Sequence, residues 1–245
     1  MSKKTPTLYL LPNLLGKHRF HEPWLPKGVD RAMEEIDGLI SESPQGGRSF
    51  LARFRTKKPP YEVPLAILNE HSKEEDINFL LEPVLNGECW GLVSDAGLPC
   101  IADPGARLVF RARKKGVQIK VFVGPSSLML ALMLTGLPGQ QFAFHGYLPK
   151  DPVKRKRKIL SLESTSKKAV ATQLFIEAPY RSKAALMSLL ESLHDTTLLG
   201  VAWDLTMPSQ GIICQSVGIW KKNSLPKIDK KPTVFLFYAN GRDWC

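Results

Sequence analysis

The sequence lacks the features of a membrane or secreted protein. Its longest uninterrupted apolar run, residues 128–134, is seven residues long, whereas a membrane-spanning helix needs about 20. The N-terminal Met1-Ser2-Lys3-Lys4 is not followed by the apolar core and cleavage site of a signal peptide. We therefore expect a cytoplasmic protein without a membrane partner.

Cysteine is scarce. The chain has four cysteines, none in a C-x-x-C pair and none at the spacing of a zinc site, namely Cys89, Cys100, Cys214 and Cys245. This pattern is typical of a reducing compartment and gives no reason to expect a bound metal.

Signature motifs of several large enzyme classes are also missing. The sequence contains no G-x-G-x-x-G, no Walker-type phosphate loop, no G-x-S-x-G and no H-E-x-x-H. The sequence therefore does not favour a dehydrogenase, a nucleoside triphosphatase, a serine hydrolase or a zinc protease.

Positive charge, in contrast, is abundant. The net charge is +11, of which residues 1–123 carry +3 and residues 124–245 carry +8. A polyanionic partner, either nucleic acid or an acidic membrane surface, would explain this excess, although many small proteins are simply basic. The segment KDPVKRKRK at 150–158 is the densest cluster. It contains four candidate phosphate contacts, Lys154, Arg155, Lys156 and Arg157, the alternative being a solvated basic loop.

The hydrophobic pattern predicts an α/β protein. With 245 residues the chain is long enough for two domains. Apolar runs predict strands at 8–11, 90–93, 117–123, 174–176, 198–203 and 233–238. Helical spacing predicts helices at 29–40, 73–86, 104–115, 126–134, 159–163 and 182–193. Ser72 with Glu75 reads as a capping box, Asp103 reads as a helix cap, and residues 41–48 read as a loop.

Four turns follow predicted strands, at 12–16, 94–99, 124–127 and 177–181. Ligands of open α/β sheets bind at the carboxyl ends of strands, where such turns lead into helices. Each turn is therefore a candidate ligand site, and each can also be an ordinary connector. The pattern by itself does not name the ligand.

The family resemblance lies in residues 69–181. The chain contains NEHS at 69–72, LVSDAGLPCIADPG at 92–105, GPSSLMLALMLTGLP at 124–138, FHGYLPK at 144–150 and LFIEAPYR at 174–181. In this order and at these spacings, the segments resemble the ribosomal RNA small-subunit methyltransferase I family, within the tetrapyrrole-methylase superfamily.

The resemblance implies two α/β domains, 1–120 and 121–245, with S-adenosylmethionine (SAM) held in the cleft between them, in a homodimer. It implies that the cofactor is bound by Pro12, Ser94, Asp95, Ala96, Gly97, Pro99, Pro125, Ser126, Ser127, Glu177, Ala178, Thr206 and Thr233.

Asp95, His71 and Glu177 are the candidate catalytic residues. Asp95 and Glu177 follow strand ends, whereas His71 precedes a predicted helix. The alternatives are a turn-forming aspartate and a structural loop histidine. Because the resemblance is to an RNA methyltransferase family, it favours RNA phosphate contacts for Lys154, Arg155, Lys156 and Arg157. Arg181 is expected to hold an RNA phosphate or to pair with an acid. Trp24, Trp203 and Trp220 are either base-stacking surfaces or core residues.

Three segments depart from the family pattern. The first loop usually reads T-P-I-G-N and is here PNLLG at 12–16. The E-D-T-R segment is not evident, since only Glu42-Ser43-Pro44 stands in that region. The later R-E-x-T-K reads WDLTM at 203–207 and lacks the lysine.

The resemblance predicts 2′-O-ribose methylation of small-subunit (16S) ribosomal RNA. Two alternatives stay open at this point. One is a small-molecule methylase acting on a tetrapyrrole-type ring, and the other is a SAM-binding protein that has lost its activity on RNA.

Overall fold

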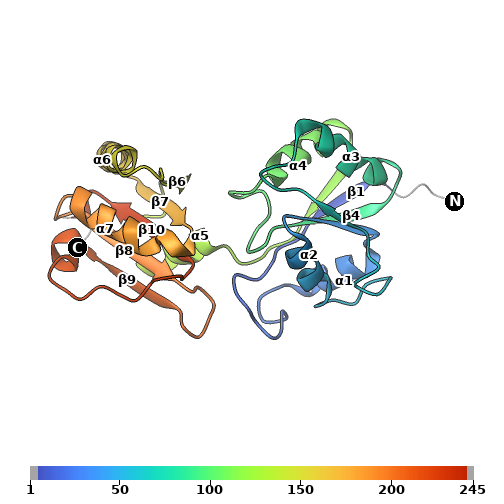
Figure 1. The fold of residues 1–245 in the computed structure, drawn as a ribbon, viewed down its shortest axis with the longest axis horizontal. Helices are drawn as coiled ribbons and strands as arrows, with labels where there is room; N and C mark the ends of the chain where they lie inside the picture. Colours follow the sequence, from blue (N-terminus) through green and yellow to red (C-terminus); the bar gives the residue numbers. More distant parts are fainter. Residues whose placement is uncertain (1–4, 242–245) are drawn as a thin grey trace. The chain divides into compact units, whose positions relative to one another are not determined.

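A computed structural model describes residues 5–241 (Figure 1). The N-terminal Met1-Ser2-Lys3-Lys4 and Cys245 lie outside the described residues. The chain divides into two compact units, unit 1 (residues 1–126) and unit 2 (residues 127–245), each built on a five-stranded sheet. The predicted α/β class is confirmed. The boundary expected at residue 120 falls inside the last strand of unit 1.

The sheet of unit 1 is parallel throughout. Its strands are β1 (Thr7–Leu10), β2 (Gly38–Ser41), β3 (Leu65–Ile67), β4 (Cys89–Val93) and β5 (Gln118–Val121). They lie in the order β3-β2-β4-β1-β5, and every pair is parallel. All five carboxyl ends therefore meet at one edge of the sheet, where α/β proteins bind ligands.

Helices cover both faces of this sheet (Figure 1). On one face lie α1 (Lys27–Glu35) and α2 (Pro44–Leu51), and on the other α3 (Glu74–Leu85) and α4 (Gly105–Lys114). Strand residues alternate between the two cores: Leu39 packs with Met33 and Phe50, and the adjacent Ile40 packs in the core that contains Leu81. This alternation is the two-residue period of a strand buried on both faces.

The sheet of unit 2 is mixed. Its strands are β6 (Phe142–Tyr147), β7 (Thr172–Glu177), β8 (Leu198–Trp203), β9 (Gly211–Ser216) and β10 (Thr233–Tyr238), in the order β6-β7-β10-β8-β9. Only β6 and β7 are parallel, and the other neighbours are antiparallel. Consequently, the end of β7 and the start of β10 lie at the same edge.

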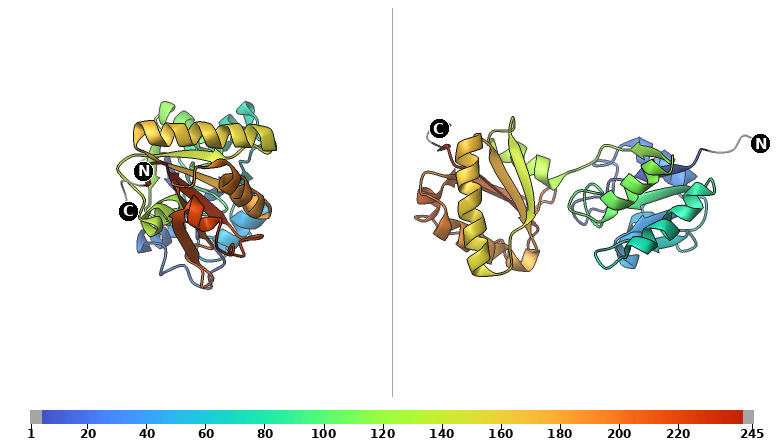
Figure 2. Two further views of the ribbon diagram at one scale, coloured as in Figure 1. Left: turned by 90° about the vertical axis from the view of Figure 1, so that its left-hand side faces the viewer. Right: turned by 90° about the horizontal axis from the view of Figure 1, so that it is seen from above.

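Unit 2 carries its helices α6 (Pro152–Ala169) and α7 (Ser182–Ser192) against one face of the sheet, where Figure 2 shows α6 as a long helix. Apolar side chains of both helices pack on Phe175, Phe235 and Phe237, together with Trp220 of the short α8 (Val217–Trp220). Helix α5 (Ser127–Thr135) contacts β8, β9 and β10.

Several sequence-based boundaries were wrong. The helix predicted at 29–40 ends at Glu35, and Ile40 belongs to β2. The loop predicted at 41–48 contains the start of α2, because Ser43 accepts a hydrogen bond from Gly46 N and Pro44 occupies the first turn. The basic segment 152–158 lies inside α6, which runs on to Ala169. Strands β2, β3, β6 and β9 were missed.

Candidate functional site

Four loops meet at the carboxyl edge of the unit 1 sheet. Three of them, after β1, β4 and β5, were predicted from the sequence, and the fourth follows β2. Asn13 joins the first two: its backbone N–H donates to Gly97 O at 2.7 Å, and its side-chain amide donates to Ser94 O and Asp95 O at 2.9 and 3.0 Å. Arg53 Nη1 donates to Asn13 Oδ1 at 3.0 Å. Asn13 thus fixes the loop after β1 against the turn after β4.

Asp95 presents its carboxylate at this edge. The residue is exposed, and Ser43 Oγ donates to Asp95 Oδ1 at 3.1 Å. A Cβ at Gly46 would lie 2.1 Å from the same oxygen, so only glycine leaves room for the carboxylate there. The backbone N–H of Asp95 donates to Glu42 Oε1 at 3.3 Å. The segment after β2, in which the E-D-T-R motif is not evident, therefore supports Asp95.

Asp103 also turns toward this group. It was predicted to cap α4, but the N-cap of that helix is Pro104 and has no side-chain hydrogen bond. The pKa of Asp103 is raised to about 7, mainly by burial and in addition by the neighbouring Glu42 carboxyl, to which Asp103 is hydrogen-bonded. Burial likewise raises the pKa of Glu42. The two carboxyls therefore share a proton near neutral pH, because both cannot ionise side by side without cost.

This pair predicts a pH-dependent stability. Because the pKa of Asp103 is about 7 in the folded chain and 3.8 otherwise, the folded state binds the proton more tightly. We expect the free energy of unfolding to fall between about pH 4 and pH 7, on the order of 2 kcal/mol after allowance for the half-exposed position. Urea unfolding at pH 5 and pH 8 measures this, and Asp103→Asn should remove the decrease. An equal decrease in Asp103→Asn would contradict the assignment, and Glu70→Gln, at an exposed acid, is the control.

The remaining unit 1 residues lie around the same turns. Ser94 is buried and donates to Ala96 O at 3.0 Å. Gly97 has a φ of +74°, which favours glycine. A Cβ at Gly124 would lie 2.1 Å from Pro12 Cβ, so the loops after β1 and β5 pack tightly. Three other predicted cofactor ligands, Pro99, Pro125 and Ser126, are half-buried in these loops, and Ser127 opens α5.

His71 stands apart from this group. Its side chain is 84% exposed, and it pairs with Glu70 Oε1 at 3.6 Å. The predicted capping box nearby was shifted by one residue: α3 begins at Glu74, and Lys73 N donates to Asp76 Oδ2 at 2.6 Å. Nothing in the described contacts brings His71 to Asp95.

The predicted residues of unit 2 gather at one edge of its sheet. Glu177 ends β7 and is the direct register partner of Thr233 at the start of β10, which in turn pairs with Trp203 at the end of β8. Ala178 follows Glu177 directly, and Thr206 lies in the turn after β8 with a φ of +73°. These four predicted residues, distant in sequence, therefore share one sheet edge.

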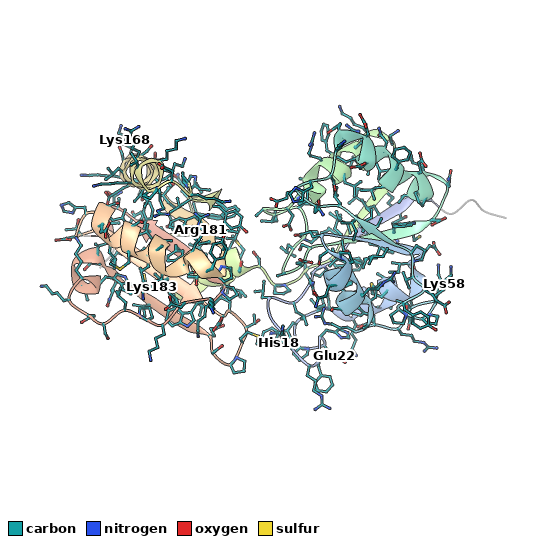
Figure 3. The ribbon with its side chains drawn as sticks, in the orientation of Figure 1. His18, Glu22, Lys58, Lys168, Arg181 and Lys183 are labelled. Carbon is teal, nitrogen blue, oxygen red and sulfur yellow. The ribbon has the colours of Figure 1, made fainter. Side chains whose placement is uncertain are left out.

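Glu177 is a buried carboxylate. Its side chain is fully shielded from solvent, and Arg181 Nη2 lies 2.6 Å from its Oε2 in an ion pair. The approach falls outside hydrogen-bond geometry, and among residues 5–241 neither oxygen has an aligned donor. Burial raises the pKa of Glu177, and Arg181 opposes this effect most strongly. Arg181 also donates to Leu148 O at 3.1 Å, so it is held inside unit 2 (Figure 3).

The turn after β8 contains an ion pair. The family lysine is replaced by Met207, but Lys231, just before β10, places its Nζ 2.7 Å from Asp204 Oδ2. Ser182 Oγ donates to the carbonyl of the same lysine at 3.2 Å. The lysine of this acid–lysine pair thus comes from a different loop, the one that precedes β10.

The basic side chains of α6 point in different directions, because successive residues of a helix face different sides. Lys154, Lys156 and Arg157 are exposed, and Lys168 near the other end of the helix lies on its outer side (Figure 3). Arg155 instead turns inward and donates to Ser188 Oγ at 3.0 Å. Of the five predicted RNA-binding residues, three therefore face solvent, whereas Arg155 and Arg181 are engaged within unit 2.

The three tryptophans considered as stacking surfaces differ in exposure. Trp220 is 1% exposed and donates to Leu199 O at 2.8 Å, so it is a core residue. Trp203 packs against the same core. Trp24 is 38% exposed.

Within residues 5–241, no helix is long and apolar enough to span a membrane, and no group of three or more His, Cys, Asp or Glu has the arrangement of a metal site.

The two sheets, with the loops gathered at their edges, define a two-unit α/β protein. Residues 27–218 match the family described as Tetrapyrrole (Corrin/Porphyrin) Methylases. This match covers most of the chain, and the chain therefore belongs to the tetrapyrrole methylase family.

Named relatives agree with the motif resemblance. The chain is 32% identical over 165 residues to Ribosomal RNA small subunit methyltransferase I of Thermotoga maritima, covering 67% of this chain and 70% of that one. It is 30% identical over 204 residues to the protein of the same name in Vibrio cholerae, covering 82% and 65%. The chain thus spans slightly less than two thirds of the Vibrio protein.

Solved structures share the fold at low identity. The crystal structure of the methyltransferase CobJ aligns with a TM-score of 0.62 at 18% identity, covering 95% of this chain and 92% of that one. The cobalt precorrin-4 methyltransferase CbiF aligns with a TM-score of 0.60 at 14% identity, covering 95% of each. At such identities, the likeness establishes the architecture alone.

Proposed function

We propose that the chain is a SAM-dependent methyltransferase that methylates a ribose 2′-oxygen of small-subunit (16S) ribosomal RNA. The observation that carries the proposal is the convergence of Pro12, Asp95 and Pro125 at one edge of the unit 1 sheet, within a family fold. The names of the two sequence relatives support the choice of RNA.

The loops at this edge suit a ligand such as SAM, which carries an ammonium, a carboxylate and ribose hydroxyls beside its transferable methyl group. The exposed Asp95 carboxylate can accept hydrogen bonds from an ammonium or a hydroxyl. Gly46 leaves room for the Asp95 carboxylate, and Gly97 adopts a positive φ of +74° that side chains rarely allow. The proposed cofactor residues of unit 2 are Glu177, Ala178, Thr206 and Thr233.

A ribose hydroxyl becomes a good nucleophile only as it loses its proton, so a positioned acceptor accelerates the reaction. Asp95 is the proposed acceptor because it is the exposed carboxylate at the edge, held by Ser43. Its neighbours Glu42 and Asp103 share a proton and thereby limit the negative charge around it. Glu177 lacks solvent access, which favours a positioning role for it through Arg181.

The exposed face of α6 is the proposed contact for RNA phosphates. Lys154, Lys156 and Arg157 project from it, and no acidic residue follows them before Glu163, whose carboxylate accepts from His194 N and Thr197 Oγ1. Clustered cations release counterions when they bind a polyanion, so the affinity should decrease steeply with salt. Arg155 and Arg181, which face inward, are proposed to orient this helix and its neighbouring turn.

We further propose that the protein acts in the cytoplasm as a homodimer. Support for a second copy as partner comes from exposed apolar side chains of unit 2: Met133 of α5 is 76% exposed, and Phe142 on the edge strand β6 is 41% exposed. We propose that a second copy covers these exposed apolar side chains.

The test is transfer of labelled methyl from SAM to small ribosomal subunits purified from cells that lack this protein. Label on the RNA, located at a ribose by nuclease digestion, is the expected result. Absence of label on subunits and on naked RNA, in a chain that binds SAM, would refute the RNA assignment and direct the search to tetrapyrrole-type acceptors. A chain that does not bind SAM would refute the methyltransferase assignment itself.

A further inference from the structure

The loop between β1 and α1 carries exposed aromatic rings among cations. We call residues 17–27, KHRFHEPWLPK, which end at the first residue of α1, the aromatic–basic loop. Phe20 is 58% exposed and Trp24 is 38% exposed. The guanidinium carbon of Arg19 lies 4.9 Å from the Phe20 ring centre, and the rings of His18 and Trp24 are 4.9 Å apart. Each of the two rings thus lies beside a basic side chain, Arg19 beside Phe20 and His18 beside Trp24.

This exposure belongs to a well-anchored loop. His21, 8% exposed, bonds Asp30 Oδ1 through its Nε2 at 2.7 Å, and its ring lies 4.4 Å from that of Phe54. The backbone N–H groups of Trp24 and Leu25 both donate to His21 O at 2.9 Å. A buried histidine therefore fixes the loop, and the rings are presented to solvent on a defined backbone.

The anchor also ties the loop to the proposed site. Phe54, which packs on His21, follows Arg53, whose guanidinium donates to Asn13 Oδ1. Asn13 in turn holds the turn that contains Asp95. The aromatic–basic loop, on which Figure 3 labels His18 and Glu22, is thus connected to the carboxyl edge within unit 1.

The chemistry of the loop matches unpaired nucleotides. Lys17, Arg19 and Lys27 outnumber the single acid Glu22, which suits a phosphate backbone. Bases of a single strand offer free faces that stack on aromatic side chains, whereas a double helix keeps its base faces covered. A second copy of this chain would bring the same excess of positive charge to the loop and is therefore disfavoured as its occupant.

We propose that the aromatic–basic loop is a stacking platform for unpaired nucleotides of the RNA substrate, with Phe20 and Trp24 as the stacking rings. The inference rests on the proposed function for the identity of the RNA. It adds a base-binding surface in unit 1 to the phosphate-binding surface proposed on α6.

The experiment compares the affinity of three RNA probes for the full chain by fluorescence anisotropy: an unstructured 12-nucleotide strand, the same strand with abasic sites, and a duplex of equal length. The double variant Phe20→Ala/Trp24→Ala should bind the unstructured strand at least about tenfold more weakly. Its affinity for the abasic strand and the duplex should change less than about twofold. The ring-preserving variant Phe20→Tyr/Trp24→Phe should bind like wild type.

Phe110→Ala is the matched control. Phe110 is 63% exposed and its ring centre lies 4.7 Å from Lys114 Nζ, but it is the only aromatic residue of α4. Equal loss on all three probes, or equal loss in Phe110→Ala, would overturn the platform. Unchanged affinity of the double variant in a wild-type protein that binds RNA would overturn it while leaving the proposed function intact. If the wild-type chain methylates ribosomal subunits but binds none of the three probes, the stacking platform is refuted and the proposed function is not. In the methyl-transfer assay with small subunits as substrate, the double variant should have a higher KM than wild type and an unchanged kcat.

Discussion

Asp95→Ala is expected to reduce methyl transfer to small subunits at least about 100-fold, because a positioned proton acceptor contributes roughly 100- to 10,000-fold. The loss should come without unfolding. Asp95 is exposed, and Ser43 Oγ donates to its carboxylate, 3.1 Å from Oδ1 and 3.4 Å from Oδ2, so the free energy of unfolding should change by less than about 1 kcal/mol. The rate of label transfer and a urea melt measure the two effects on the same preparation.

Two further variants identify the role of that carboxylate. Gly46→Ala would place a Cβ 2.1 Å from Asp95 Oδ1 and should displace the carboxylate, so it should reproduce much of the loss. Glu70→Ala removes another exposed acid of unit 1 and should leave the rate unchanged. Full activity in Asp95→Ala would show that Asp95 does not take part in the reaction.

Arg181→Met is expected to destabilise unit 2 by about 3–5 kcal/mol, because it leaves a buried charge without its partner. Glu177 is fully shielded, and Arg181 is only 14% exposed. Lys221→Met is the matched control: Lys221 and Asp195 lie at the same 2.6 Å separation, but both are largely exposed. Removing that surface pair should change stability little, since solvent screens it.

The loss in Arg181→Met should depend on pH. The pKa of Glu177 is already raised by burial, and removal of Arg181 raises it further. Stability is then highest where the carboxyl is protonated, and it falls as pH rises above the ordinary value near 4.5. Urea unfolding at pH 5 and pH 8 measures this. Glu177→Gln/Arg181→Met should recover most of the stability. A single variant as stable as wild type at pH 8 would contradict the buried-pair interpretation.

Local patterns were sufficient for the long apolar elements. The strands at 198–203 and 233–238 were predicted to the residue, because alternating or continuous apolar residues there end in clear turn signals. The segment 41–48 was misread, since Pro44, Gly46 and Gly47 usually indicate a loop. There Ser43 caps a helix, and Gly47 packs tightly against Ser41 and Leu65, so tertiary contact outweighed helix propensity.

Candidate site residues were predictable where a turn directly follows a strand, as for Asp95 and Glu177. Asn13, Glu42 and Lys231 were missed because each acts through residues far away in sequence. Asn13 bonds a turn more than 80 residues distant, and Lys231 pairs with Asp204. Arg155 and Arg181 were expected to meet RNA, but only the fold reveals that they turn inward.

The sequence by itself determined the α/β class, the family and the turns at which ligand chemistry is concentrated, because these depend on residue period and on short motifs. The tertiary structure alone decided which turns share a sheet edge, which carboxyls approach closely enough to share a proton, and which aromatic rings stay exposed. These properties depend on strand order and burial, and burial sets both the free energy of a charge and the accessibility of a ring.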